Sequence, residues 1–144
     1  MNQVKIQIPS LIENIRVIES FIDNSKDEFE FEDDIYGNIM VAVTESVNNA
    51  IRHGNKFDKD KNVYLTLQVE DNKLLFEVED EGPGFDYENL PDPTAPENLE
   101  SPGGRGIFLM RNLCDEVNFD NNGKKVRLIF NVLPATNGTS YWVL

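Results

Sequence analysis

The sequence predicts a single α+β domain, residues 1–144, in which an antiparallel or mixed β-sheet carries helices on one face. Its 144 residues, of which 40% are hydrophobic and nine are Phe, are enough to form one hydrophobic core. Apolar residues recur at helical spacing in the first third of the chain and at alternate positions afterwards. Turn sequences divide the alternating part into two hairpins, and this order of elements is typical of an α+β fold.

The first elements are a strand and a helix. Apolar residues alternate with polar ones over 4–8, which predicts a short strand that ends at Pro9. Ser10 and Glu13 have the spacing of a capping box and predict that a helix begins there. The apolar stripe of this helix consists of Leu11, Ile15, Ile18 and Ile22.

A second helix is predicted over residues 35–53, after a charged linker at residues 27–34. Gly54 is a plausible C-terminal stop for this helix. Its apolar side consists of Ile39, Val43, Val47, Ala50 and Ile51.

A hairpin follows, with strands at residues 63–69 and 74–78 and a turn at residues 71–72. Residues 85–104 have no regular period and contain four of the seven prolines of the chain. Loops of more than about 15 residues in a compact domain are usually lids or binding loops. We therefore expect a lid at about residues 85–104.

The last elements are a short helix at residues 107–113 and a second hairpin. The hairpin begins at residues 117–119, turns at 121–123 and returns over 126–132. For residues 135–144, both a mobile tail and a docked strand remain open.

The composition excludes several classes of site. One Cys cannot form a disulfide within the chain, and one His with one Cys cannot form a Cys- and His-based metal centre. Any functional metal should therefore be a hard cation held by oxygen, such as Mg²⁺. The formal net charge of −13 disfavours DNA or RNA as a partner. Because neither a signal sequence nor a run of about 18 apolar residues is present, we expect a cytoplasmic protein without a membrane segment.

Polar residues gather on one side of the second predicted helix. Glu45, Asn48, Asn49 and Arg52 are spaced by three and four residues and therefore share one face. Adjacent asparagines are unfavourable within a helix, because their amides compete for backbone groups. The face is either solvated or a source of oxygen ligands for a divalent cation, with Glu45 free to act as a base.

A buried carboxylate is predicted at the end of the first hairpin. Asp80 is in phase with the core-facing residues of its strand, where an unpartnered carboxylate would be costly. A donor on a ligand, such as an exocyclic amine, would offset that cost. Gly82 and Gly84 would allow the backbone to approach the ligand closely. The alternative is an ordinary hairpin end.

Glycines also precede the last predicted helix. Gly103, Gly104 and Gly106 would leave free N–H groups at a helix start, which is a ready site for phosphate. Arg105 adds a guanidinium within the same segment. The alternative is a flexible hinge before the helix.

The three segments together resemble the motifs of the gyrase, heat-shock chaperone, histidine kinase and MutL (GHKL) ATPase superfamily. Residues 45–55 resemble its N box, residues 80–85 its G1 box and residues 104–107 its G2 box. Within the superfamily, the compact length and residues 103–117 look most like the anti-sigma-factor serine kinases of bacteria. The resemblance covers residues 4–133 and implies a two-layer ATP-binding sandwich.

The resemblance also implies roles for single residues. Glu45 matches the general base, and Asn49 matches the ligand that bridges Mg²⁺ to the triphosphate of ATP. Asp80 matches the acceptor of the adenine amine. The remaining residues assigned to the nucleotide site are Asn48, Arg52, Gly82, Gly84, Gly103, Gly104, Arg105 and Gly106.

The implied function is that of an ATP- and Mg²⁺-dependent serine/threonine protein kinase. Its substrate would be a small anti-sigma-factor antagonist, and its other partner a sigma factor that it holds inactive. The resemblance also implies a homodimer formed through the first strand and helix. Two other functions remain open: a non-catalytic, ATP-gated protein-binding module, and a detached catalytic domain of a histidine kinase. We expect His53 to cap or pack the end of its helix rather than to accept phosphate.

Overall fold

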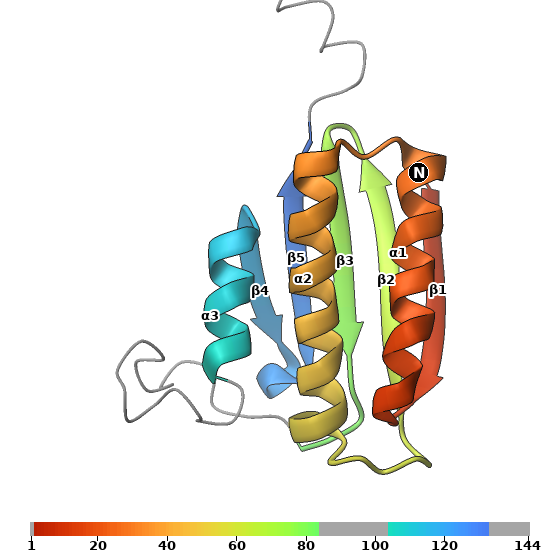
Figure 1. Ribbon diagram of the computed structural model, residues 1–144. Helices are drawn as coiled ribbons and strands as arrows, with labels where there is room; N and C mark the ends of the chain where they lie inside the picture. Colours follow the sequence, from red (N-terminus) through yellow and green to blue (C-terminus); the bar gives the residue numbers. More distant parts are fainter. Residues whose placement is uncertain (1, 84–103, 133–144) are drawn as a thin grey trace, which may run out of the picture.

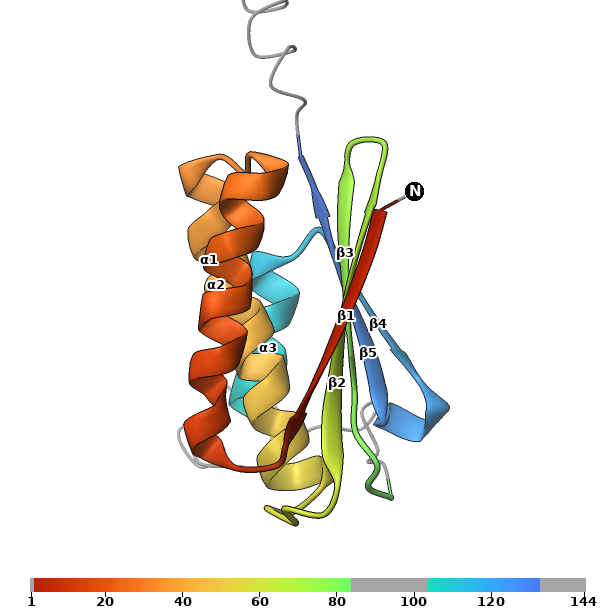
Figure 2. The same cartoon turned by 90° about the vertical axis from the view of Figure 1, so that its right-hand side faces the viewer.

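The computed structural model describes residues 2–83 and 104–132, which form two layers. One layer is a five-stranded sheet and the other consists of three α-helices on one face of it (Figures 1 and 2). The predicted α+β fold with an antiparallel sheet is confirmed. The predicted lid lies outside the described residues except for Gly104, and the tail at 135–144 lies outside them entirely.

The sheet has the strand order β1-β2-β3-β5-β4, and every neighbouring pair is antiparallel. Its strands are β1 (Asn2–Pro9), β2 (Asn62–Glu70), β3 (Lys73–Glu79), β4 (Glu116–Asp120) and β5 (Lys125–Asn131). Alternate residues of β2 and β3 are buried, as a sheet with one covered face requires. The alternation of apolar and polar residues in the sequence therefore reflects the burial of one face of the sheet.

The helix layer consists of α1 (Ile15–Phe29), α2 (Asp33–Asn49) and α3 (Gly104–Leu113). A short 3₁₀ turn, η1 (Ile12–Asn14), leads into α1, and a π-helical turn, η2 (Ala50–Gly54), continues α2. Figure 1 shows α1 beside β1 and β2, α2 in front of β3 and β5, and α3 in front of β4. None of the described helices is both long and apolar enough to cross a membrane.

The core lies between the two layers. Ile22 of α1, Ile39 of α2 and Phe76 of β3 are completely buried in it. Phe76 packs edge to face against Phe130 of β5, with ring centroids 6.0 Å apart. The helical stripes and the alternating strands predicted from the sequence thus meet in one apolar cluster.

The predicted charged linker at residues 27–34 is wrong in its extent. Helix α1 continues to Phe29 and α2 begins at Asp33, which leaves a connection of three residues. Glu30 ends α1 in the left-handed conformation, with φ of 55°. Lys26 forms a salt bridge of 2.8 Å with Asp33, so the charged side chains support a tight helical hairpin.

The predicted capping box is also wrong. Ser10 does not cap the helix, because its Oγ donates a hydrogen bond of 2.6 Å to the carbonyl oxygen of Lys61. The segment instead begins as a 3₁₀ turn after Leu11, without a side-chain cap. A long-range contact has taken the hydroxyl that the local pattern assigned to the helix start.

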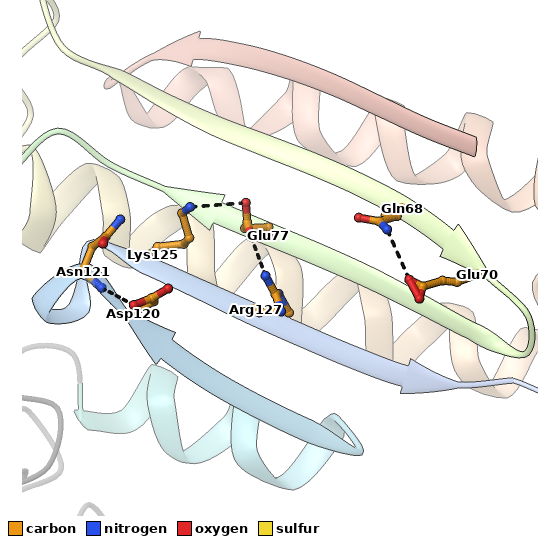
Figure 3. Close-up of polar contacts among 7 residues, drawn as sticks. All are labelled: Gln68, Glu70, Glu77, Asp120, Asn121, Lys125 and Arg127. Atoms are coloured by element: carbon orange, nitrogen blue, oxygen red, sulfur yellow. Dashed lines mark hydrogen bonds and ion pairs between the residues drawn. The ribbon is translucent and has the colours of Figure 1, made fainter. Parts of the chain in front are cut away.

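The outer face of the sheet is polar. Glu77 of β3 lies 3.3 Å from Arg127 and 3.8 Å from Lys125, both on β5, and Figure 3 shows these pairs between the two strands. Such partly exposed ion pairs contribute about 1 kcal/mol or less each. In Figure 1, the C-terminal end of α2, the end of β3, the start of α3 and the β4–β5 connection all lie at the lower end of the molecule. The candidate site lies at this end.

Candidate functional site

A cavity of about 180 Å³ lies between α2, β3, α3 and the β4–β5 hairpin. Its polar lining residues include Ser46, Asn49, His53, Asp80 and Lys124. Its apolar lining consists of Ala50, Val78, Ile107, Met110, Phe119 and Val126. Apolar walls with a few polar groups are typical of a small-molecule site.

Asp80 is the buried acid of this cavity, with only 9% of its surface exposed. It directly follows β3, and its backbone N–H donates to the carbonyl oxygen of Lys124 at 2.9 Å. Its Oδ1 accepts a hydrogen bond of 2.8 Å from the backbone N–H of Gly82. Burial raises the pKa of Asp80 above its usual value, and the Gly82 hydrogen bond opposes that shift. The inward orientation predicted from strand parity is confirmed.

Two glycines allow the backbone to close around Asp80. A Cβ added to Gly54 would lie 2.3 Å from Oδ2 of Asp80, and one added to Gly82 would lie 1.8 Å from the carbonyl oxygen of Gly54. Gly54 does end η2, as the sequence predicts. The sequence does not predict its close packing against Asp80, because it does not show which segments meet.

We expect Gly82→Ala to lower both the stability and the affinity for nucleotide. The new Cβ would meet a backbone carbonyl, so the segment that carries Asp80 must move, and overpacking of this kind costs about 1–3 kcal/mol. Thermal unfolding and a nucleotide titration measure the two effects. Gly37→Ala is the control, since nothing lies within 4 Å of its added Cβ. Unchanged behaviour of Gly82→Ala would contradict the close packing.

Asn55 connects three segments next to the cavity and is 2% exposed. Its Nδ2 donates to Ser10 Oγ at 2.8 Å and to the carbonyl oxygen of Asn62 at 3.0 Å. Its Oδ1 accepts a hydrogen bond of 2.7 Å from the backbone N–H of Glu81. One amide therefore fixes the loop after η2 to the segment that follows Asp80.

We expect Asn55→Ala to lower the free energy of unfolding by about 1–3 kcal/mol, because Ser10 Oγ, the Asn62 carbonyl oxygen and the Glu81 N–H all lose a hydrogen-bond partner. Chemical denaturation of wild type and variant measures this difference. Asn38→Ala, at an exposed position of α2, should change it by less than about 0.5 kcal/mol. Equal effects of the two substitutions would show that the buried network contributes little.

Glu45, Asn49 and Gly106 lie together where α3 meets α2. A Cβ on Gly106 would lie 2.7 Å from Asn49 Nδ2 and 3.2 Å from Glu45 Oε2. The Nδ2 atom of Asn49 is buried and has no hydrogen-bond partner among the described residues. Rotation of this amide exchanges its nitrogen and oxygen, so Asn49 can offer an oxygen ligand to a cation. The arrangement fits a hard cation such as Mg²⁺.

The other two polar residues predicted on this face of the helix, Asn48 and Arg52, lie elsewhere. Asn48 and Arg52 do not belong to the described lining of the cavity; with Glu45 they line a separate shallow hollow between the start of α1 and α2. The Nε of Arg52 donates to Oδ1 of Asn48 at 3.0 Å, and its guanidinium lies over the ring of Phe57. The structure thus brings Asn49 to the cavity and places Glu45 at the edge of the hollow.

The glycine segment before α3 is described only in part. Gly104 begins α3, so backbone N–H groups at this helix start are available to an anion. Gly106, two positions further along the same helix, is buried. Gly84, Gly103 and the side chain of Arg105 lie outside the described part of the chain.

His53 was expected to cap or pack a helix end, and the structure places it in the lining of the cavity. Burial and the nearby Arg52 charge lower the pKa of His53, which favours the neutral form of the ring. Ser46, Gly123 and Lys124 also line the cavity and were not identified from the sequence. Ser46 comes from α2, and the other two come from the β4–β5 connection. Their meeting at one cavity depends on how these distant segments pack, which no local sequence pattern shows.

The chain matches the family model described as "Histidine kinase-like ATPase domain" over residues 8–130. It is 27% identical to the serine-protein kinase RsbW of Bacillus subtilis over 125 residues, which cover 83% of this chain and 78% of that protein. It is 36% identical to the anti-sigma F factor of Bacillus velezensis over 97 residues, or 62% of this chain and 65% of that protein. A solved structure of the RsbU and RsbW domains of a Mycobacterium tuberculosis protein matches with a TM-score of 0.66 and 15% identity, covering 91% of this chain and 32% of that one.

Proposed function

Since the chain belongs to the histidine kinase-like ATPase domain family, we propose that it is an ATP-dependent serine-protein kinase. Relatives that share 27% and 28% identity over most of the chain are named serine-protein kinase. The observation that carries the proposal is the meeting of Glu45, Asn49 and Gly106 beside a cavity that holds a buried Asp80. A base, a cation ligand and a nucleotide pocket are then available in one place.

The cavity is suited to the base of ATP. Its apolar walls would cover the faces of the adenine ring, and the Asp80 carboxylate would accept a hydrogen bond from the exocyclic amine. The phosphates would extend toward the start of α3, where Gly104 begins the helix and Gly106 packs closely against Asn49. Through its contact with Gly54, Gly82 would keep the segment that carries Asp80 close to the adenine ring.

Glu45 is the proposed general base. Its carboxylate and the side chain of Asn49 both lie next to Gly106. Glu45 also borders the hollow, through which a protein substrate could approach. It would take the proton from a serine hydroxyl as that oxygen attacks the γ-phosphorus of ATP, the bond from this phosphorus to the β–γ bridging oxygen breaks and ADP leaves. Bound Mg²⁺ would neutralise the phosphate charge, and Asn49 would hold it together with phosphate oxygens.

The proposed protein partners are an anti-sigma-factor antagonist as substrate and a sigma factor that the kinase holds inactive. The name of the relative in Bacillus velezensis, anti-sigma F factor, supports this assignment. A cytoplasmic location follows from such partners. A homodimer through β1 and α1 is also proposed, because β1 is one of the two edge strands of the sheet and, among the described residues, pairs only with β2.

Transfer of labelled γ-phosphate from ATP to an antagonist protein encoded beside the kinase tests the proposal. We expect acid-stable phosphate on a serine or threonine of the antagonist. Binding of ATP without any transfer would favour the ATP-gated binding module. Acid-labile phosphate on a histidine would instead favour a detached catalytic domain of a histidine kinase.

A further inference from the structure

Ser46 is a buried hydroxyl of α2 whose bonding differs from that of its neighbours. Its exposed fraction is 2%, and its Oγ has no hydrogen-bond partner among the described residues. Elsewhere in the helices, Ser25 Oγ donates to the carbonyl oxygen of Phe21 at 2.8 Å, and Thr44 Oγ1 to that of Met40 at 2.6 Å. Helical hydroxyls commonly make this bond to the residue four positions earlier. Ser46 does not, although its helix offers the same geometry.

The position of Ser46 explains where its missing partner could come from. The residue lines the same cavity as Asp80, and Asn49, three positions later on the same side of α2, lines it as well. An unpartnered buried hydroxyl is unfavourable, and a ligand in the cavity can relieve that cost. Because the hydroxyl makes no hydrogen bond within the described part of the chain, rotation about a single bond can turn it toward a ligand.

We propose that Ser46 is a specificity-determining residue, whose hydroxyl donates to the purine ring nitrogen N1 and thereby selects adenine over guanine. The inference rests on the proposed function, in which Asp80 accepts from the exocyclic amine. An ionised carboxylate can only accept, whereas a serine hydroxyl can donate. Adenine presents an amine donor beside the N1 acceptor, which complements this pair. Guanine presents a carbonyl oxygen beside an N1–H donor, so its oxygen would face the carboxylate.

Nucleotide analogues test this reading of N1 directly. The probe is 1-deaza-ATP, in which a C–H replaces N1 and the amine is retained. We expect wild type to bind 1-deaza-ATP about 3- to 10-fold more weakly than ATP, as the loss of one hydrogen bond implies. Ser46→Ala should weaken ATP binding by a similar factor and leave 1-deaza-ATP binding unchanged. Equal affinities of wild type for the two nucleotides would overturn the proposal without any variant.

Ser25→Ala is the matched control. It removes a buried serine hydroxyl that already has a partner within α1, and Ser25 does not belong to the described lining of the cavity. We expect Ser25→Ala to leave the ratio of the affinities for ATP and 1-deaza-ATP unchanged. Ser46→Ala should instead make the two affinities nearly equal. If Ser46→Ala weakens both nucleotides equally, the residue acts through packing and the proposal is wrong.

The experiment separates this inference from the proposed function. If wild type binds neither nucleotide, the proposed ATP-dependent function fails, and the role of Ser46 fails with it. If wild type binds ATP but does not distinguish it from 1-deaza-ATP, only the role of Ser46 fails. Wild type should also reject GTP, and Ser46→Ala should narrow the difference between ATP and GTP by the factor that it costs ATP.

Discussion

Replacing Glu45 by Gln should slow phosphoryl transfer to the serine substrate by about 10²- to 10⁴-fold, the usual contribution of a general base. The affinity for Mg·ATP should change little, because the proposed base contacts the substrate hydroxyl rather than the nucleotide. Gln keeps the size of the side chain, and Glu45 is only partly buried, so the fold should tolerate the change. The loss is then a loss of rate alone.

Single-turnover transfer with saturating ATP, together with an ATP titration, separates these two quantities. Glu19→Gln is the control. Glu19 lines the same hollow from α1, and its substitution removes the same charge as Glu45→Gln. If both substitutions slow transfer equally, the hollow acts through its overall charge and Glu45 is not the base. If neither slows transfer, the kinase mechanism proposed for this site is contradicted.

Replacing Asp80 by Asn should weaken ATP binding by about 10- to 100-fold, as expected for the loss of a hydrogen bond to a charged acceptor. The same variant should be at least as stable as wild type without nucleotide. Asn can still accept from the N–H of Gly82, so the local backbone bond is kept. The substitution removes a buried carboxylate whose ionisation the fold disfavours.

The sign of the pH effect follows from the raised pKa of Asp80. The folded protein holds this proton more tightly than the unfolded chain, so the protonated carboxyl stabilises the fold at low pH. That stabilisation is lost as the pH rises from the ordinary Asp pKa through the raised one. Asp80→Asn should abolish this part of the pH dependence. ATP binding by wild type should weaken in the opposite direction, as the pH falls and the carboxyl becomes neutral.

Glu79→Gln is the matched control for Asp80. It changes the neighbouring carboxylate, whose side chain points to the other face of β3. We expect it to leave both ATP affinity and stability close to wild type. If Asp80→Asn binds ATP as well as Glu79→Gln does, the adenine amine does not contact Asp80.

Much of the site could be predicted from the sequence, because local periodicity determines which way a side chain points. The strand alternation placed Asp80 on the buried face, and the helical spacing placed Glu45 and Asn49 together. The packing of Gly106 against both is a contact between α2 and α3. The sequence predicts that glycines lie near the phosphates, but it does not show which side chains each glycine packs against.

The features that were missed depend on contacts between distant parts of the chain. Asn55 bonds Ser10, 45 positions earlier, and Glu81, 26 positions later, and no local pattern shows this. The same network removes Ser10 from the capping role that its spacing suggests. At residues 27–34, charge density suggested a linker, although the charged side chains lie on a helical hairpin that buries Phe31. Composition alone cannot separate these two cases.

The most direct test of the proposed site is a crystal structure of the protein with Mg²⁺ and a non-hydrolysable ATP analogue. We expect the adenine amine within hydrogen-bond distance of Asp80, Mg²⁺ bound by Asn49, and the γ-phosphate beside the Glu45 carboxylate at the start of α3. Adenine bound outside the cavity, or a triphosphate directed away from Gly106, would contradict the proposed site and the mechanism built on it.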